Sequence, residues 1–296
     1  MESLDNVDCW ICDCGFVHVK WQGRVYTLSR DIGWLSSDEY HDKYHPHHHP
    51  CVICKNDENK LDRSCSLDAI TMESVDRFIA VGLYYSDEFQ NVNQLLSQWI
   101  LQFKRDPSYA EPLGCALAKV IDEYWHDLLM RDCARIIAIP IPKHPNEGRN
   151  QALDLARAVV NRLRNYNILL IPDLITKKEP TKAGERRDKC SKECGSDPEC
   201  LAKCNVEEEL RILEFNGRKY RGLVVNSCIL VIDDVRTTGA TIGAVARLLK
   251  DNGASKVFAA VLARNALKNE LSKCIIASHW ENHDYYRRGC RDEEHD

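Results

Sequence analysis

The sequence predicts an α/β protein, with a parallel sheet flanked by helices and a small cysteine-rich module in front of it. From about residue 78, short apolar runs of strand length alternate with segments whose apolar residues recur at helical spacing. The 15 cysteines are concentrated before residue 66 and around residues 190–204. A length of 296 residues fits two units at roughly 100 to 200 residues per domain.

We divide the chain where its cysteine content and its apolar spacing change. Residues 1–70 are predicted to form a module rich in cysteine and histidine, with too few apolar residues to fold without a metal. Residues 71–267 form the α/β domain, which an excursion at 172–226 interrupts with charges and cysteines. Residues 268–296 are a polar tail.

The elements of the α/β domain follow from apolar spacing. We expect strands at 78–84, 136–141, 228–232 and 257–262, and helices at 92–103, 112–128, 152–163 and 242–249. Within the excursion, Phe215-Asn216-Gly217-Arg218 is typical of a hairpin turn. Alternating strands and helices build a parallel sheet, in which ligand-binding loops follow the carboxyl ends of strands.

Composition excludes several classes of protein. Apolar residues make up 44% of the chain and charged residues 29%, which are ordinary globular values. The net charge of −5 gives no general attraction to phosphate polymers, so an anion site must be local. No apolar run approaches the roughly 18 residues of a spanning helix. The acidic first residues are unlike a leader, so we expect a cytoplasmic protein without membrane partners.

The segment Cys228–Thr241, CILVIDDVRTTGAT, carries the most chemical information. An apolar strand ends in two carboxylates and runs into a turn rich in hydroxyls that opens a helix. Thr237, Thr238 and Thr241 offer hydroxyl donors, and Gly239 lets backbone amides approach an anion at the positive end of the helix. This pattern predicts a phosphate-binding loop.

The two carboxylates beside that loop narrow the ligand class. Asp233 and Asp234 are suited to accept hydrogen bonds from a vicinal diol or to hold a hydrated divalent cation. Ala240 follows the glycine where a nucleotide P-loop has lysine. The combination therefore indicates a sugar phosphate.

The run VIDDVRTTGAT closely resembles the motif that binds phosphoribosyl pyrophosphate (PRPP) in class I phosphoribosyltransferases, and the chain resembles their ComF family from about Phe78 to Arg264. The resemblance implies transfer of a 5-phosphoribosyl group to an acceptor that the sequence does not specify, with release of pyrophosphate and with Mg²⁺ bound alongside PRPP. It implies that Asp233 and Asp234 hold the ribose hydroxyls. The 5′-phosphate would be bound by Arg236, Thr237, Thr238, Gly239, Ala240 and Thr241.

A second segment, AIPIPKHPNEGRNQ at 138–151, resembles the family's pyrophosphate loop. Pro140, Pro142, Gly148, Asn150 and Gln151 match the family pattern. Two positions depart from it: Glu147 stands where the family has arginine, and Arg149 where it has phenylalanine. We expect Lys143 and Arg149 to bind the pyrophosphate.

The cysteines indicate metal ligands, because thiols in the cytosol are kept reduced. The pairs Cys9–Cys12 and Cys51–Cys54 each have the CxxC spacing of a structural Zn²⁺ site. A helical hairpin would bring together a second set, for which zinc and two disulfides fit equally well: Cys190, Cys194, Cys200 and Cys204. The scattered cysteines are expected to be small buried apolar residues, among them Cys115, Cys133 and Cys228.

Two other functions fit parts of the sequence. ComF-like proteins are associated with DNA uptake, so a PRPP sensor or a single-stranded DNA-binding protein without turnover is one alternative. The acidic net charge and the lack of a basic stripe with interleaved aromatics disfavour the nucleic-acid role. A zinc-ribbon scaffold whose α/β core has lost its substrate is the other alternative, supported by the departures at Glu147 and Arg149.

Overall fold

A five-stranded parallel sheet forms the centre of the protein. The computed structural model describes residues 7–12, 17–29, 71–84, 95–180 and 183–265. The sheet has the strand order β4-β10-β9-β5-β6, and every neighbouring pair is parallel. Its strands are β4 (Arg77–Tyr84), β5 (Ile136–Pro140), β6 (Ile168–Leu170), β9 (Cys228–Arg236) and β10 (Lys256–Asn265).

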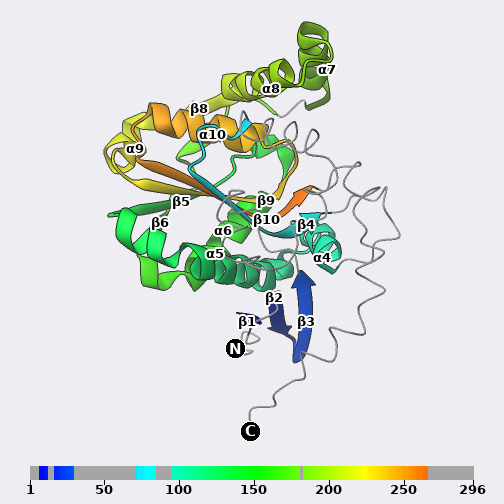
Figure 1. Ribbon diagram of the computed structural model, residues 1–296, viewed down its shortest axis with the longest axis vertical. Coiled ribbons are helices and arrows are strands. Elements are labelled where there is room, and N and C mark those ends of the chain that lie inside the picture. Colours follow the sequence, from blue (N-terminus) through cyan, green and yellow to red (C-terminus); the bar gives the residue numbers. More distant parts are fainter. Residues whose placement is uncertain (1–6, 13–16, 30–70, 85–94, 181–182, 266–296) are drawn as a thin grey trace, which may run out of the picture.

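Helices cover both faces of this sheet (Figure 1). One face carries α4 (Leu95–Phe103), α5 (Ala110–Asp132) and α6 (Gln151–Arg162). The other carries α9 (Gly217–Val224) and α10 (Ala240–Asp251). The predicted α/β class, a parallel sheet flanked by helices, is confirmed.

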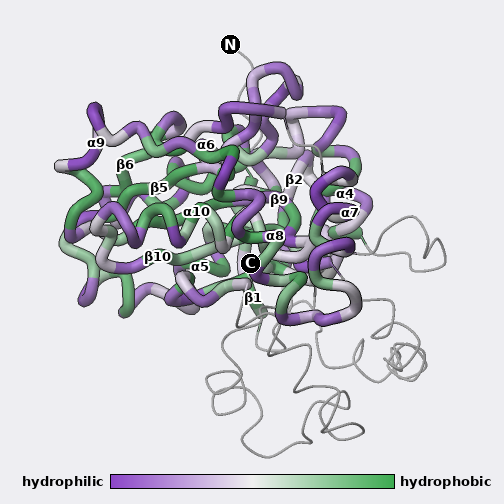
Figure 2. Tube along the Cα trace, turned by 90° about the horizontal axis from the view of Figure 1, so that it is seen from above, coloured by the Kyte–Doolittle hydropathy of each residue, from purple (hydrophilic) through white to green (hydrophobic). Residues whose placement is uncertain are grey.

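The sheet is buried on both faces, which explains its continuous apolar strands. In β9, Leu230 and Ile232 pack toward α5 and α6, whereas Ile229 and Val231 pack toward α10. Figure 2 shows β5 and β6 in hydrophobic colours and the outer helix α9 as largely hydrophilic. Two apolar clusters, one on each side, therefore fix the sheet between its helices.

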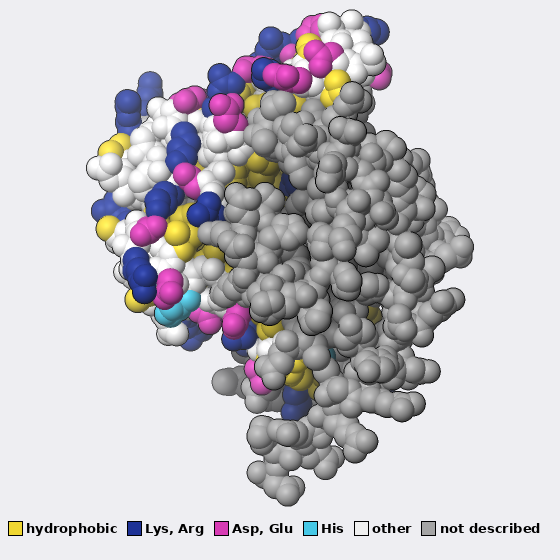
Figure 3. Space-filling view, in the orientation of Figure 1, with side chains coloured by type: hydrophobic (Ala, Val, Ile, Leu, Met, Phe, Trp, Pro, Cys, Tyr) yellow, Lys and Arg dark blue, Asp and Glu magenta, His cyan; other side chains and the backbone are white. Residues whose placement is uncertain are grey.

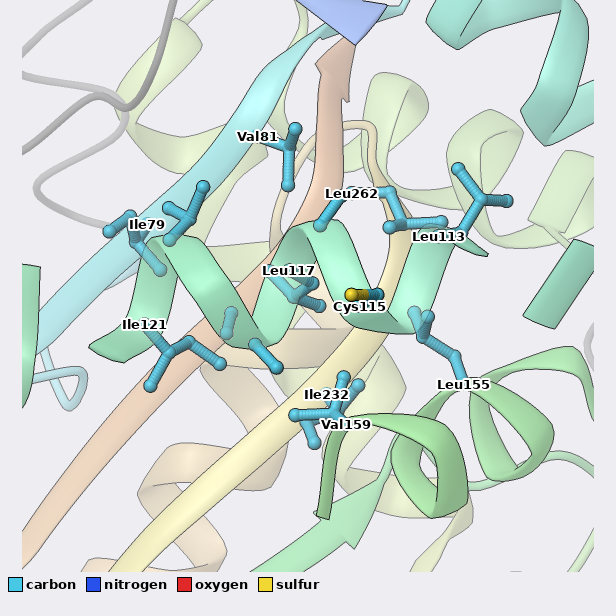
Figure 4. Close-up of a cluster of buried hydrophobic side chains, with 14 of the residues drawn as sticks. Ile79, Val81, Leu113, Cys115, Leu117, Ile121, Leu155, Val159, Ile232 and Leu262 are labelled. Atoms are coloured by element: carbon cyan, nitrogen blue, oxygen red, sulfur yellow. The ribbon is translucent and has the colours of Figure 1, made fainter. Parts of the chain in front are cut away.

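Helices α5 and α6 approach each other closely on the first face. Leu117 and Ile121 of α5 share a buried cluster with Ile232 of the sheet and Leu155 of α6 (Figure 4). A Cβ atom added at Gly114 would lie 2.4 Å from the Cβ of Ala158. The small residue at 114 therefore sets the distance between the two helices.

The N-terminal residues form a three-stranded antiparallel sheet that was not predicted. It consists of β1 (Asp8–Ile11), β2 (Val17–Trp21) and β3 (Arg24–Ser29), with β2 in the middle. Trp21 and Tyr26 make edge contacts with Trp99, the first with a centroid distance of 5.3 Å and the second of 5.0 Å. Val17 and Val19 belong to the same apolar cluster as α4 and α5. This sheet thus shares the core of the α/β domain.

The excursion contains the expected helical hairpin. Its strands β7 (Ile175–Lys177) and β8 (Leu213–Phe215) pair antiparallel, and between them lie α7 (Ala183–Cys194) and α8 (Pro198–Ile212). The prediction of a hairpin turn at 215–218 is wrong. Strand β8 pairs antiparallel with the earlier strand β7 and not with a strand that follows it. Asn216 therefore precedes an amphipathic helix, α9, which begins at Gly217 and buries Val224.

The cysteines of the described residues form four disulfides. They join Cys9 to Cys115, Cys133 to Cys228, Cys190 to Cys204, and Cys194 to Cys200. The expectation that Cys115, Cys133 and Cys228 are unpaired apolar residues is therefore wrong, because each faces a cysteine from a distant part of the chain.

The zinc predictions are corrected where the structure describes them. Cys190, Cys194, Cys200 and Cys204 form the two disulfides that were the alternative to a second zinc site, since the i, i+4 pairs face each other across the hairpin. Cys9 is paired with Cys115, so it is not a thiolate ligand beside Cys12, which is free. Cys51 and Cys54 lie outside the described residues. Across the described ranges, no group of three or more His, Cys, Asp or Glu residues is arranged to hold a metal.

Candidate functional site

The segments 138–151 and 228–241 come together at the carboxyl ends of two neighbouring parallel strands. Strands β5 and β9 are neighbours, with Pro140 in register with Ile232. The N–H of Ile141 donates to the carbonyl of Ile232 at 2.9 Å, and β9 then continues as far as Arg236. From β5 the chain goes to β6 on one side, and from β9 to β10 on the other. Such a reversal of strand order is where open α/β sheets bind ligands.

The acid pair lies in the part of β9 that extends past β5. Asp233 and Asp234 are both partly buried, and the N–H of Asp234 donates to Oδ1 of Asp233 at 2.9 Å. Burial and the carboxylate of Asp234 raise the pKa of Asp233 well above its ordinary value of 3.8, while the positive charge of Lys177 lowers it. The ionised form of Asp233 is therefore disfavoured until a positive or hydrogen-bonding partner arrives.

The turn after the acid pair has the features of an anion-binding loop. Gly239 has φ +81° and immediately precedes α10, which begins at Ala240 and runs for 12 residues. Thr237 and Thr238 are exposed, and Thr241 is partly exposed. Hydroxyls and helix N-terminal amides are thus presented together next to the acid pair.

Close packing holds this loop from behind. A Cβ atom at Gly239 would lie 2.9 Å from Nε of Arg236, and one at Gly243 would lie 1.9 Å from the carbonyl oxygen of Thr71. Arg236 is buried, and its guanidinium lies 5.1 Å from the ring centroid of Phe78. Of the residues expected to bind the 5′-phosphate, Arg236 therefore supports the loop, whereas the threonines are accessible.

The expected pyrophosphate residues are engaged within their own loop. Nζ of Lys143 donates to the carbonyl of Arg149 at 2.8 Å and to Oε1 of Gln151 at 3.3 Å. Nε of Arg149 donates to Oδ2 of Asp154 at 2.6 Å, and its Nη1 donates to the carbonyl of Phe103 at 3.0 Å. Lys143 and Arg149 thus fix the shape of the loop that follows β5, and binding of pyrophosphate by either one stays a prediction.

The departure at Glu147 has a structural explanation. Residues Pro145–Glu147 form a short 3-10 helix, η3, that begins after His144. The N–H of His144 donates to Oε2 of Glu147 at 3.2 Å, and Nδ1 of His144 accepts from the N–H of Asn146 at 3.2 Å. The carboxylate at position 147 therefore closes a capping box, a task for which the family's arginine is unsuited.

Two charged residues of the excursion, Lys177 and Glu209, were missed. Lys177 of β7, Arg186 of α7 and Glu209 of α8 form a buried ionic cluster. The sequence gives no signal for it, because three isolated charges in a charge-rich segment are brought together only by the fold.

Comparison with protein-family models finds no match for this chain, and a search of curated proteins finds none either. A proposed function therefore depends on the geometry of the described residues and on the motif resemblance.

Proposed function

We propose that the protein is a PRPP-binding phosphoribosyltransferase, which transfers a 5-phosphoribosyl group to an acceptor and releases pyrophosphate. The observation that supports this best is the position of the acid pair and the threonine-rich turn. Asp233, Asp234 and the start of α10 lie together where strand order reverses, beside the loop that follows Pro140. A diol site, a phosphate site and a third polar loop at one edge suit a phosphorylated pentose.

Each part of the site has a task in this reaction. The carboxylates of Asp233 and Asp234 accept hydrogen bonds from the ribose hydroxyls. The amides at the start of α10 and the hydroxyls of Thr237 and Thr238 bind the 5′-phosphate. These contacts orient carbon 1 of the ribose, which gains positive charge as the bond to pyrophosphate breaks.

The donor set fits Mg²⁺. Asp233 and Asp234 provide carboxylate oxygens, and magnesium is usually held by one or two carboxylates together with substrate phosphates. When bound, the ion supplies positive charge that stabilises the departing pyrophosphate. The residues of this chain hold the pentose in place.

Titration of PRPP in the presence of Mg²⁺ by calorimetry tests the proposal. We expect the wild-type protein to bind and the variant with Asp233→Asn and Asp234→Asn to lose detectable binding, because both diol contacts are weakened. The control is Asp251→Asn, which changes an exposed acid at the far end of α10. Equal binding by the double variant and the control would overturn the assignment.

A PRPP sensor or a single-stranded DNA binder without turnover remains the alternative. Release of pyrophosphate with candidate acceptors supports the transferase. A salt-dependent shift in the gel mobility of single-stranded DNA, without release of pyrophosphate, supports the DNA-binding protein. Figure 3 shows acidic and basic side chains mixed over α7 and α8, without a basic stripe on the described part of that face.

A further inference from the structure

The segment that precedes β4 lies along α10, the helix that follows the threonine-rich turn. We call residues 71–76 the strap. The N–H of Asp76 donates to the carbonyl of Val257 at 2.8 Å, and Oδ2 of Asp76 accepts from the N–H of Val257 at 2.6 Å. The same oxygen lies 2.7 Å from Nζ of Lys250, in the last turn of α10. One end of the strap is therefore fixed near the C-terminal end of this helix.

The other end of the strap lies against the first turn of α10. A Cβ atom at Gly243 would lie 1.9 Å from the carbonyl oxygen of Thr71, so the backbone of the strap touches the backbone of the helix. The N–H of Gly243 donates to the carbonyl of Gly239 at 2.8 Å, which closes the first turn. The strap thus spans α10 and reaches the turn that carries the phosphate-binding groups.

The strap also contacts that turn directly. A Cβ atom at Gly239 would lie 3.2 Å from Sδ of Met72 and 3.4 Å from Cγ2 of Thr71. Gly239 is buried, whereas Thr237 and Thr238 are exposed. Met72 and Thr71 therefore pack behind the turn, and they leave its two hydroxyl-bearing residues accessible to a ligand.

This packing matters because the turn bends at a glycine. Gly239 has φ +81°, and a glycine can leave such a conformation at little cost unless its neighbours hold it there. Arg236 is one neighbour, with its Nε 2.9 Å from a Cβ atom at Gly239, and the strap supplies the others. Backbone amides bind an anion well only when they are held in place before it arrives.

We propose that Met72 and Thr71 are positioning residues of the 5′-phosphate loop, which hold Gly239 and the start of α10 in the conformation that binds phosphate. This inference rests on the proposed function and goes beyond it, because it brings into the site a segment outside both sequence motifs. Coupling between two sites is reciprocal, so phosphate bound at the loop should also change the environment of the strap.

The methionines of the chain allow a direct test of this coupling. The chain has three, of which Met72 lies behind the loop and Met130 is 58% exposed in the last turn of α5. In protein labelled with ¹³C at the methionine methyl groups, we expect ribose 5-phosphate to shift the Met72 signal and to leave the Met130 signal in place. Met72→Leu and Met130→Leu assign the two signals. A Met72 signal that stays fixed at saturating ribose 5-phosphate would contradict the inference.

Calorimetry with ribose 5-phosphate measures the effect on binding. We expect Met72→Ala to weaken binding about fivefold or more, because Gly239 loses a neighbour that holds it. Met72→Leu should retain most of the affinity, since leucine has a similar volume. Met130→Ala is the matched control and should stay within about twofold of wild type. If Met72→Ala lowered the melting temperature and kept the affinity of wild type, its role would be structural only.

A second pair of variants displaces the strap without changing its side chains. Gly243→Ala places a methyl group where the carbonyl of Thr71 lies, so it should weaken binding of ribose 5-phosphate and move the Met72 signal before any ligand is added. Gly222→Ala in α9 is the control, because a Cβ atom there meets nothing within 4 Å. Equal affinity of these two glycine variants would count against the strap as a support of the loop.

A parallel titration of PRPP with Mg²⁺ separates failure of this inference from failure of the proposed function. If wild type binds both ligands and Met72→Ala binds them equally well, the inference is overturned and the proposed function stands. If wild type binds ribose 5-phosphate but not PRPP, the proposed function fails, and the ribose 5-phosphate data still decide the role of Met72. If wild type binds neither ligand, both proposals are overturned.

Discussion

Asp233 carries a carboxyl group that is costly to ionise where it lies. Burial and the negative charge of Asp234 raise its pKa in the folded protein above the ordinary value of 3.8. The folded state therefore binds this proton more tightly than the unfolded state does. The stability that the protonated group provides is complete below the ordinary pKa, and it is lost as pH rises through the raised pKa of the folded state.

A substitution that removes this charge should stabilise the free protein while it weakens ligand binding. We expect Asp233→Asn to have a higher free energy of unfolding than wild type at pH 7, and we expect the difference to shrink toward pH 3.8. Urea unfolding between pH 4 and pH 8 measures it, with Asp251→Asn as the exposed control. A difference that stays constant over this pH range would contradict the assignment of the raised pKa to Asp233.

Among the elements, the packing of α5 on α6 depends on one glycine. A methyl group at position 114 would lie 2.4 Å from the Cβ of Ala158, so Gly114→Ala must push the helices apart. We expect a loss of about 1–3 kcal/mol in unfolding free energy, as in other overpacked cores. Denaturant unfolding measures this loss.

Two further variants make the glycine test specific. Adding Ala158→Gly to Gly114→Ala removes the facing methyl group and should recover much of the loss, less the cost of a helical glycine. Gly222→Ala in α9 is the control, because a Cβ atom there meets nothing within 4 Å and alanine favours the helix. An equal loss at positions 114 and 222 would show that the effect is not due to the helix contact.

The elements that the sequence predicts well are those with a strong apolar period. Strands β5, β9 and β10 were expected because each is a continuous apolar run, although β9 and β10 extend beyond the expected ends. Helices α5, α6 and α10 were expected close to their observed bounds because their buried residues repeat at helical spacing. Strand β6 has only three residues, too few for a period. The antiparallel sheet β1–β3 was missed because its cysteines favoured a metal module, although Val17, Val19 and Trp21 alternate as in a half-buried strand.

The candidate site also has a part that the sequence predicts and a part that only the fold brings together. The acid pair and threonine turn are local in sequence, so both could be recognised before the fold was known. The partners of Lys143 and Arg149 and the cluster around Lys177 depend on contacts between distant segments. Charged residues have many possible partners, and only the folded chain selects among them.

At the scale of the whole molecule, the four disulfides bear on the expectation that the cysteines are reduced. Disulfides are uncommon in a reducing cytosol, although intracellular proteins of hyperthermophiles are an exception. No helix among the described residues is long and apolar enough to cross a membrane. For the eight paired cysteines of the described residues, disulfides replace the expected free thiols or zinc ligands. The predicted zinc ligands Cys51 and Cys54 lie outside the described residues.

The disulfides should stabilise the protein unequally. Cys133–Cys228 joins residues 95 positions apart, whereas Cys194–Cys200 closes a loop of only 6 positions at the tip of the hairpin. A crosslink that closes a longer loop removes more conformational entropy from the unfolded chain. We expect the variant with Cys133→Ala and Cys228→Ala to lose about 4–5 kcal/mol of unfolding free energy, and the variant with Cys194→Ala and Cys200→Ala to lose about 2 kcal/mol.

Guanidinium unfolding of the oxidised proteins measures both losses, after alkylation and mass spectrometry have counted the free thiols. Each double variant should keep the other disulfides, so its count of blocked thiols should equal that of wild type. If the two double variants lost equal stability, the long link would not act through the unfolded chain, and the gain would have to come from contacts in the folded state.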